Sequence, residues 1–318
     1  MADVTTIDVT TLEGSDKFPV NVNDVYGLIE TIASQNIRAV KSTNRIVDGF
    51  YDYDVENGKV IEEAVIAMAQ AQAYNKNDFA FTPSDPDVRP RYFNNFTPVQ
   101  FEATVRRDDI RAVLANKGVG LDNVVGQILE TLTQGEGFDD FKKMRNVLFN
   151  ADVTNYNTTV LKGNPANMKG VIYAIRDAYN HLIATNSDLT AENFESGTPA
   201  EDIRIAITPK LLNLIDVVEL ANVFNLEKEE LMGKLVVVDV DDLSDATNYY
   251  KVLVYDRKAF GRATRTYDYT QDVSGRARFT NHYLTVERAY FHNGLFKAAR
   301  IDATAAATAA RAEIITAQ

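Results

Sequence analysis

IRIAITPKLLNLIDVVELANVFN (residues 203–225) begins the most informative part of the chain. It is followed by KLVVVDV (234–240), YKVLVYDRKAFGR (250–262) and NHYLTVERAYFHNGLFKAARI (281–301). Isoleucines alternate at 203, 205 and 207, which predicts a strand. Thr208-Pro209 then combines an N-cap residue with proline at the first helical position. The apolar runs LVVV and VLVY predict central strands of a sheet covered on both faces. This order of elements predicts a compact α+β unit.

Two more helices are predicted upstream of this unit. Asn164-Pro165 repeats the cap-then-proline signature, and apolar residues at helical spacing follow it over 168–183. Asp24 is the predicted cap of another helix over 25–40, which follows an extended N-terminal stretch.

A strand and a long amphipathic segment are predicted between these helices. Residues 96–106 (FTPVQFEATVR) have the pattern of a strand, and 121–132 place their apolar residues on one helical face. We expect Gly135 and Gly137 to interrupt this helix before a second apolar stripe continues over 138–149.

Residues 50–92 have the features of a long hairpin. Asn57-Gly58 is a strong hairpin turn signal, and small alanines recur at every second position from 67 to 73. The residue types there also suit a helix, but the strict alternation after a turn favours a strand. The three prolines of 83–92 (PSDPDVRPRY) predict a loop. Such a hairpin cannot bury a core of its own, so it needs a partner to lie on.

Composition narrows the class of protein. The chain has 318 residues, no cysteine, three histidines and a net charge of −12. The absence of cysteine rules out disulfides and thiolate metal sites. We find no signal peptide and no apolar run of about 20 residues, and therefore expect a soluble protein. No basic stripe suited to phosphate contacts is present. If the protein surrounds DNA, its net acidic wall would repel the phosphates, which suits a container better than a transcription factor.

Few residues suggest chemistry. The carboxylates Asp239, Asp241, Asp242 and Asp245 follow a predicted strand and could ligate a hard cation, but their spacing matches no EF-hand. A solvated loop is the favoured interpretation, and we predict no metal and no cofactor. No nucleophile elbow, phosphate loop or dinucleotide fingerprint occurs.

Arginines concentrate in the last quarter of the chain. They stand at 257, 262, 265, 276, 278, 288 and 300, whereas acids dominate near the N-terminus. One interpretation is ordinary exposed charge, which contributes little per pair. The other is a charge-complementary contact between different faces of neighbouring subunits, a heterologous interface that closes into rings.

The order of these segments, above all ITPKLLNLIDVVELANVFN, VVVDVDD and VYDRKAFGR, resembles the major capsid proteins of tailed bacteriophages with the HK97-type fold. The resemblance implies five parts: an N-terminal arm (1–48), an extended β-hairpin or E-loop (49–92), a peripheral domain with a spine helix (93–160 and 277–301), an axial α+β domain (161–276) and a C-terminal tail (302–318). The hairpin and the arm would lie on neighbouring subunits.

The same resemblance implies a function that resides in contact surfaces rather than in an active site. Pentamers and hexamers would tile an icosahedral virion head around double-stranded DNA, assembled in the host cytoplasm with a portal protein and possible decoration proteins. Because the chain begins almost directly with the arm, scaffolding would come from a separate protein or be absent. The subunit-interface candidates are Asp54, Asn57, Gly58, Lys59, Ile61, Arg262, Arg265, Arg276 and Arg278.

Some HK97-type capsids also link a hairpin lysine to a neighbour's asparagine with the help of a glutamate. Lys59, Asn281 and Glu287 stand in comparable segments, but no motif requires the link, and an ordinary exposed lysine is favoured. Other classes remain open as alternatives: an encapsulin-like nanocompartment that packages an enzyme, a ring-forming tail or connector protein, or a soluble carboxylate-dependent enzyme with one deep cleft.

Overall fold

The computed structural model describes residues 45–69, 85–106, 121–190, 195–215, 234–238, 250–274 and 279–316. The chain divides into two compact units: the first comprises Met1–Lys41, Gln100–Gly137 and Asp268–Thr285, and the second comprises Ser42–Val99, Phe138–Tyr267 and Val286–Gln318. Among the described residues, no helix is both long and apolar enough to cross a membrane.

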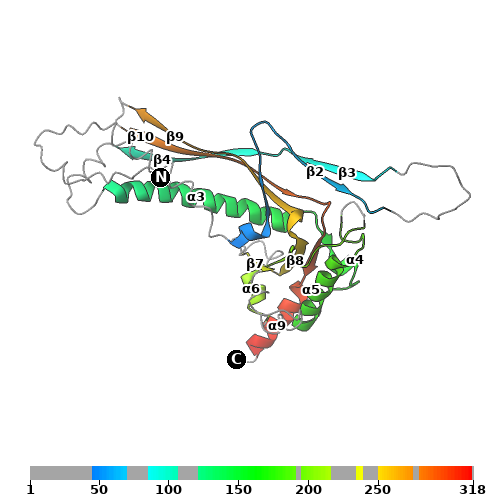
Figure 1. Ribbon diagram of the computed structural model, residues 1–318. Helices are drawn as coiled ribbons and strands as arrows, with labels where there is room; N and C mark the ends of the chain where they lie inside the picture. The colour runs from blue at the N-terminus through cyan, green and yellow to red at the C-terminus, as the bar shows by residue number, and fades with distance from the viewer. Residues whose placement is uncertain are drawn as a thin grey trace, which may run out of the picture. The chain divides into compact units, whose positions relative to one another are not determined.

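A five-stranded sheet forms the centre of the second unit (Figure 1). Its order is β5 (Thr154–Asn155), β11 (Ala298–Asp302), β8 (Lys251–Asp256), β6 (Ile203–Ile207) and β7 (Leu235–Val237). β8 pairs antiparallel with both β11 and β6 and is a central strand, as its VLVY run predicts. The LVVV run was expected to be central as well, but β7 pairs with β6 alone and ends the order of described strands.

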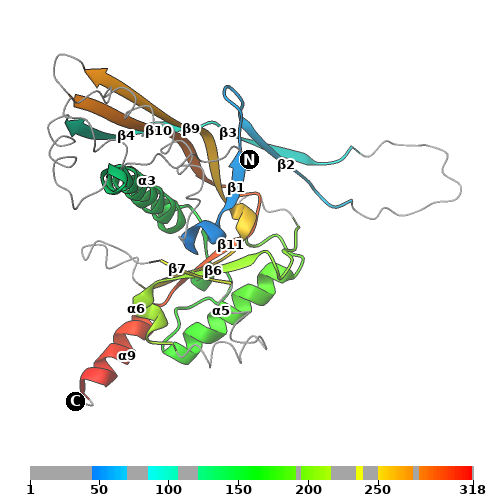
Figure 2. The same ribbon diagram turned by 60° about the vertical axis from the view of Figure 1, so that its left-hand side comes forward.

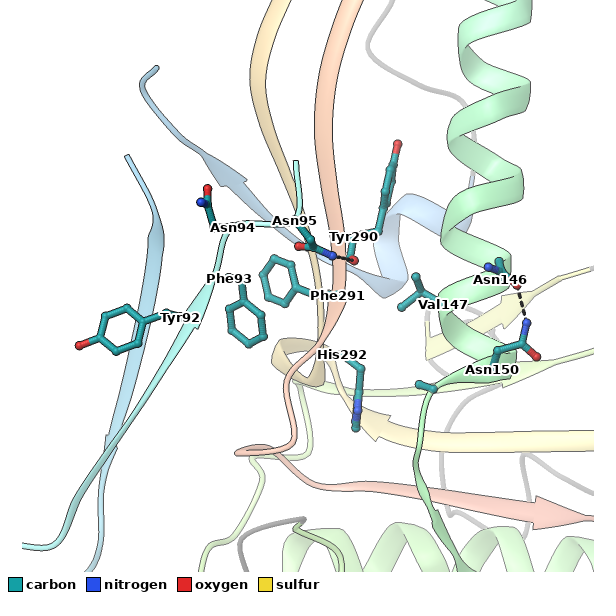
Figure 3. Close-up of a pocket in the computed structure, with 11 residues that line it drawn as sticks. Tyr92, Phe93, Asn94, Asn95, Asn146, Val147, Asn150, Tyr290, Phe291 and His292 are labelled. Carbon is teal, nitrogen blue, oxygen red and sulfur yellow. Dashed lines mark hydrogen bonds between the residues drawn. The ribbon is translucent and has the colours of Figure 1, made fainter. Parts of the chain in front are cut away.

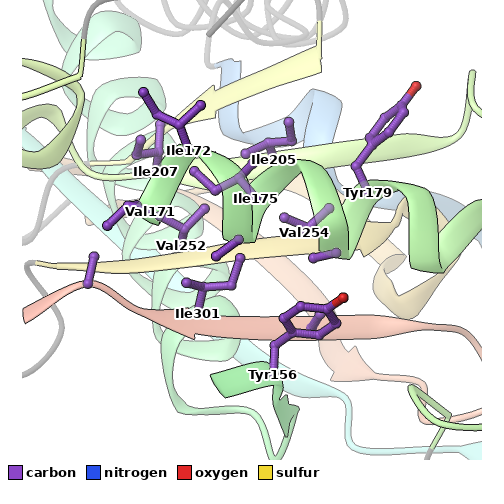
Figure 4. Close-up of a cluster of buried hydrophobic side chains, with 14 of the residues drawn as sticks. Tyr156, Val171, Ile172, Ile175, Tyr179, Ile205, Ile207, Val252, Val254 and Ile301 are labelled. Carbon is purple, nitrogen blue, oxygen red and sulfur yellow. The ribbon is translucent and has the colours of Figure 1, made fainter. Parts of the chain in front are cut away.

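Both faces of this sheet are covered, as the apolar runs predict. Val252 and Val254 of β8 belong to a core shared with helix α5 (Met168–Ile183) (Figure 4). Leu253 and Tyr255 alternate to the other face, where a second core includes Met144. The two sets follow the period of two that a strand requires.

Helix α5 lies along one face of the sheet, and α9 (Thr304–Thr316) packs against it (Figure 2). The predicted apolar stripe is confirmed, but the helix begins at Met168 rather than at Pro165. Asn167, not Asn164, is the N-cap, and its side chain accepts a hydrogen bond from the Gly170 amide. The C-terminal segment, expected as a tail, contains a helix whose alanines reach into the core.

Thr208-Pro209 opens a helix as predicted, since α6 spans Pro209–Leu212 and the Thr208 side chain accepts from the Leu211 amide. The rest of that predicted helix lies mostly in 216–233, outside the described residues. The arm, the helix over 25–40 and the acidic cluster at 239–245 also lie outside them. The short elements η2 (Arg45–Gly49), α4 (Tyr156–Thr159) and η3 (Arg257–Ala259) also belong to the second unit.

A four-stranded sheet has the order β1 (Tyr51–Asp54), β9 (Phe260–Ser274), β10 (Phe279–His292) and β4 (Thr97–Arg106). β4 confirms the strand predicted at 96–106. A separate two-stranded sheet pairs β2 (Ile61–Ile66) with β3 (Val88–Phe93) in antiparallel register. A long hairpin therefore exists, but the strand predicted from the alternating alanines at 67–73 is not confirmed there: β2 ends at Ile66, residues 67–69 are not strand, and 70–73 lie outside the described residues.

The connection at Asn57-Gly58 differs from the expected hairpin turn. β1 pairs in parallel with β9 and β2 pairs with β3, so the turn joins two different sheets. The segment 83–92 was expected to be loop, but Val88–Phe93 is strand and Pro90 lies opposite Ala64. Proline is tolerated there because β3 is an edge strand, where one row of backbone donors has no ladder partner.

Helix α3 (Leu121–Asn150) runs unbroken through Gly135 and Gly137, so the predicted interruption is wrong. Each glycine costs a helix only about 1 kcal/mol relative to alanine, which a helix of this length tolerates. At Gly135, an added Cβ would lie 3.5 Å from the ring of Phe101 in the same unit, so the helix backbone passes close to β4 there.

Candidate functional site

Arg265 of β9 is the centre of the hairpin root, by which we mean residues 56–63 and 93–96 with the neighbouring parts of β9 and β10. Its guanidinium donates to the Lys59 carbonyl at 2.8 Å, to Asn94 Oδ1 at 3.0 Å and to Glu287 Oε1 at 3.0 Å. The same group lies 3.7 Å from the centroid of the Phe96 ring. The planar guanidinium carries several donors in a fixed geometry and stacks on aromatic rings, so one side chain joins β9 to three other segments.

An aromatic cluster holds the first residue pair of the hairpin. Ile61 is 5% exposed and lies opposite Phe93 in the register. The Phe93 ring stacks on Phe291 with 3.9 Å between centroids, and Tyr53 of β1 approaches the same ring at 5.7 Å. The root therefore has an apolar core in addition to its polar contacts.

Glu63 of β2 ties the hairpin to two other segments. Asn293 Nδ2 donates to its Oε2 at 2.6 Å, and the Tyr53 hydroxyl donates to its Oε1. Burial and the neighbouring Glu63 carboxylate raise the pKa of Tyr53 above its usual range, so the phenol stays a donor at neutral pH.

Asp140 of α3 organises a charged network in the second unit. Arg262 donates to it at 2.9 Å, Arg288 lies 3.3 Å away and the Tyr290 hydroxyl also donates to it. Arg262 reaches Asp52 of β1 as well, at 2.8 Å. Burial works against the charge on Arg262, but the two carboxylates raise its pKa on balance. Asp140 is 9% exposed and Arg262 is 11% exposed, so this pair is shielded from water, whereas Asp52 is 52% exposed.

Beyond the root, one side of the hairpin is apolar and exposed. On the side that alternates with Glu63, the register places the Glu62 carboxylate, which accepts a hydrogen bond from the Tyr92 hydroxyl at 3.1 Å. The same side carries five uncharged residues: Tyr92, Ala64, Pro90, Ile66 and Val88. Ile66 is 64% exposed and Tyr92 is 63% exposed. We call these five residues the apolar face. A contiguous exposed apolar strip of this kind marks an interaction surface.

A cavity of about 470 Å³ adjoins the root (Figure 3). Asparagines are the main polar residues of its wall, with aromatic rings around them; the lining includes Asn94, Asn95, Asn146, Asn150, Phe93, Tyr290, Phe291 and His292. The Asn95 amide donates to the Tyr290 carbonyl at 3.1 Å. Burial, and secondarily the charge of Arg91, lowers the pKa of His292 to about 4, so its imidazole is neutral at physiological pH.

The sequence model of the Phi29-like phage major capsid protein family matches residues 5–306. The chain belongs to this family. It is 21% identical over 227 residues to the major capsid protein of Bacillus phage PZA, an alignment covering 68% of this chain and 50% of that protein. The chain thus spans about half the length of this curated capsid relative.

Solved phage capsids share the fold. The chain matches the capsid structure of Staphylococcus phage Andhra with a TM-score of 0.60 and 12% identity, covering 79% of this chain and 82% of that one. It matches the capsid structure of cyanophage P-SCSP1u with a TM-score of 0.53 and 12% identity, covering 83% and 90%. The predicted α+β HK97-type capsid fold is confirmed.

Five of the nine predicted interface residues of this capsid protein lie at the hairpin root. Asn57 and Gly58 are exposed in the turn, and Lys59 pairs with Glu56 at 2.6 Å in an exposed contact. Arg265 holds the root together, and Ile61 is buried within its own chain.

The other four lie elsewhere. Asp54 is exposed at the end of β1, opposite Thr264, and Arg262 is bound in the Asp140 network. Arg276 and Arg278 lie outside the described residues. The interface role of all nine residues, and the boundaries of the predicted domains, stay predictions.

The described C-terminal arginines have partners inside the chain. Arg257 donates to the Phe50 carbonyl, Arg300 to the Ala151 carbonyl, and Arg262, Arg265 and Arg288 to the groups given above. This observation favours an intramolecular role for these charges over a free complementary surface.

Sequence reasoning missed Asp140, Asn94, Phe96 and Asn293, because no local pattern marks a residue whose partner lies far along the chain. Only the concentration of arginines pointed towards this region. Within the described part of the chain, no group of three or more His, Asp or Glu side chains is placed to hold a metal ion.

The residues of the considered lysine–asparagine link have other contacts. Glu287 accepts from Arg265 and Thr266, while Asn281 in the first unit bonds to Thr104 at 2.8 Å and to Tyr283 at 2.9 Å. These contacts give no support to a link.

Proposed function

We propose that this chain is a phage head protein that self-assembles through hexamers and pentamers into an icosahedral shell around double-stranded DNA. Membership of a major capsid family and the HK97-type fold support it. The observation that carries it is the apolar face of the hairpin, which its own described residues leave exposed.

The occupant of the apolar face, in this proposal, is a second copy of the chain. A two-stranded hairpin is marginal in water by itself, and exposed apolar side chains favour a contact that removes them from solvent. The root, fixed by Arg265 and the Phe93–Phe291 stack, gives the hairpin one direction in which to meet a neighbour. A contact between two different surfaces repeats around a ring, which is how pentamers and hexamers close.

Other parts of the proposal rest on family membership and charge. A portal protein, and separate scaffolding or decoration proteins, would join the shell, which would form in the host cytoplasm. The net charge of −12 suits a wall that encloses DNA without sequence-specific contacts. The role is structural rather than enzymatic.

The test compares two tyrosines of nearly equal exposure. Tyr92 on the apolar face is 63% exposed and Tyr173 on α5 is 65% exposed. We expect Tyr92→Ser to abolish or strongly reduce shells under conditions where the unsubstituted protein forms them, with little change in thermal stability. Tyr173→Ser should assemble normally. Negative-stain electron microscopy and light scattering report assembly. Normal shells from Tyr92→Ser would contradict the role of the apolar face.

A shortened hairpin gives an independent test. Residues 64–90 would be replaced by a two-residue Asn-Gly turn, which joins the paired residues Glu63 and Arg91 and removes four of the five residues of the apolar face. All root contacts stay, so the protein should fold as a soluble subunit that forms no shells. Shells of normal size from this variant would contradict an interlocking hairpin.

A further inference from the structure

The chain contains two Asn-Gly pairs, Asn57-Gly58 and Asn293-Gly294, which the fold places in opposite environments. An Asn-Gly pair can react with itself, since glycine leaves its backbone nitrogen unhindered for attack on the asparagine side chain. We propose that Asn57 is a site of spontaneous modification to aspartate and isoaspartate in the folded protein, that the hydroxyl of Thr266 promotes the reaction, and that Asn293 is protected.

The turn at Asn57 leaves the reacting groups accessible. Asn57 and Gly58 are both exposed, and a Cβ built on Gly58 would meet nothing within 4 Å. The Lys59 amide donates to the Glu56 carbonyl at 3.1 Å, which makes Asn57 and Gly58 the central residues of the turn. Gly58 has a φ of +82°, a value that leaves this position to glycine. Water therefore reaches both residues, and no neighbouring side chain blocks the approach of the Gly58 nitrogen to the Asn57 side chain.

Thr266 adds a donor at the reacting carbonyl. Its hydroxyl lies 3.1 Å from Asn57 Oδ1, the oxygen that gains negative charge when the amide carbon is attacked. A hydrogen bond there stabilises the developing oxyanion. The hydroxyl has a single proton and also lies 3.3 Å from Glu287 Oε2, so the two acceptors share it.

The reaction balances with water as the only other reactant. The Gly58 nitrogen forms a bond to Asn57 Cγ and gives up its proton to solvent. The Cγ–Nδ2 bond then breaks and ammonia leaves, which closes a five-membered imide. Water adds to one of the two imide carbonyls and opens the ring, giving aspartate or isoaspartate at position 57. No oxidant, metal or cofactor takes part.

Asn293 is also followed by glycine, but hydrogen bonds hold its buried side chain in place. Its residue is 0% exposed, its Oδ1 accepts from the Leu295 amide at 3.1 Å, and its Nδ2 donates to Glu63 Oε2 at 2.6 Å. Attack by the Gly294 nitrogen would require these bonds to break first, so the reaction waits for local opening. The chain thus carries its own matched control.

The product would alter the hairpin root. A carboxylate at position 57 would stand near Glu56 and share the Thr266 hydroxyl with Glu287, where like charges repel. Isoaspartate would also add one backbone carbon to the turn that connects β1 to β2. Both changes affect the connection that leads into the hairpin.

The experiment incubates the purified full-length protein, folded and in urea, at mildly alkaline pH. Peptide mapping by mass spectrometry and isoaspartate methyltransferase labelling follow both sites with time. In urea both sites should react at similar rates. In the folded protein position 57 should keep reacting while position 293 stays unmodified. Equal rates of modification at the two sites in the folded protein, or no modification of Asn57 in the folded protein, would overturn the proposal.

Variants test the role of Thr266. Thr266→Val should slow the reaction at position 57 roughly twofold to tenfold, the rate equivalent of one neutral hydrogen bond. Thr266→Ser keeps the donor and should retain the rate, and Asn57→Gln should remove the signal. An unchanged rate in folded Thr266→Val would overturn the assignment to Thr266. If Thr266→Val does not fold, Thr266→Ser provides the test. A reaction at position 57 slower in Thr266→Ser than in the unsubstituted protein would overturn the assignment to Thr266.

Discussion

Gly261 of β9 lies against the ring of Phe291, so close that a Cβ added to Gly261 would stand 2.3 Å from Phe291 Cζ. That ring is also the one on which Phe93 stacks at 3.9 Å. The absence of a side chain at position 261 is therefore what allows the aromatic cluster to hold the hairpin.

Gly261→Ala should displace the Phe291 ring and destabilise the second unit by about 1–3 kcal/mol, the usual cost of overpacking a core. Urea unfolding measures the change. Gly163→Ala is the control, because an added Cβ there meets nothing within 4 Å. Equal stability of the two variants would show that the ring moves aside at no cost.

Two adjacent aspartates of α3 allow a matched comparison of buried and surface charge. Asp140 is 9% exposed and accepts from Arg262, Arg288 and Tyr290. Asp139 is 36% exposed and pairs with Lys143 at 2.8 Å.

Asp140→Ala should cost about 3–5 kcal/mol, because it removes the buried carboxylate shared by Arg262 and Arg288 and leaves Arg262 with Asp52 alone. Asp139→Ala should change stability by no more than about 0.5 kcal/mol. Chemical unfolding of both variants provides the measurement. A small effect at position 140 would mean that water or Asp52 replaces the lost partner.

The turn at Asn57 shows where sequence reasoning reached its limit. Asn-Gly predicts a type I′ hairpin turn, which needs positive φ at both residues. Here Gly58 has positive φ but Asn57 does not, because Lys162 is the only non-glycine residue with positive φ in the described ranges. The turn therefore lacks the twist that matches paired strands, in agreement with β1 and β2 joining different sheets. A dipeptide predicts a turn, but strand partners come from distant residues.

Local patterns did predict several elements of the second unit. β6 and the apolar stripe of α5 follow from periodicity, β8 follows from its continuous apolar run VLVY, and Thr208 caps α6 as expected. The root could not be predicted in the same way. Arg265 meets Lys59, Asn94 and Glu287 only after the sheets have formed, and nothing near Arg265 in the sequence marks these partners.

Gly137 of α3, where the predicted interruption of the helix is wrong, allows a test of helix propensity. An added Cβ at Gly137 meets nothing within 4 Å, and the helix continues past it. Gly137→Ala should therefore raise the free energy of unfolding by about 0.5–1 kcal/mol through helix propensity alone. Thermal and urea unfolding measure the gain. A loss of stability would indicate that the glycine is needed for a contact with another subunit or for a local bend.

His292 should make the subunit sensitive to mild acid. Burial, with the charge of Arg91 acting in the same direction, lowers its pKa from 6.5 to about 4. As the pH falls below 6.5, the unfolded chain takes up a proton that the folded chain accepts only near pH 4. The neutral imidazole therefore makes its full contribution to the free energy of unfolding above pH 6.5. As the pH falls from 6.5 to 4, the free energy of unfolding should decrease by up to about 3 kcal/mol.

His292→Phe isolates this contribution. The ring of His292 lies 5.1 Å from that of Phe260, a contact that phenylalanine preserves, and its buried Nε2 has no hydrogen-bond partner among the described residues. The variant should match the unsubstituted protein at neutral pH and lose less stability on acidification. Urea unfolding at several pH values between 4 and 7 gives both curves. Parallel curves would place the acid sensitivity in the carboxylates instead, because each buried or paired carboxylate must also be protonated as the pH falls.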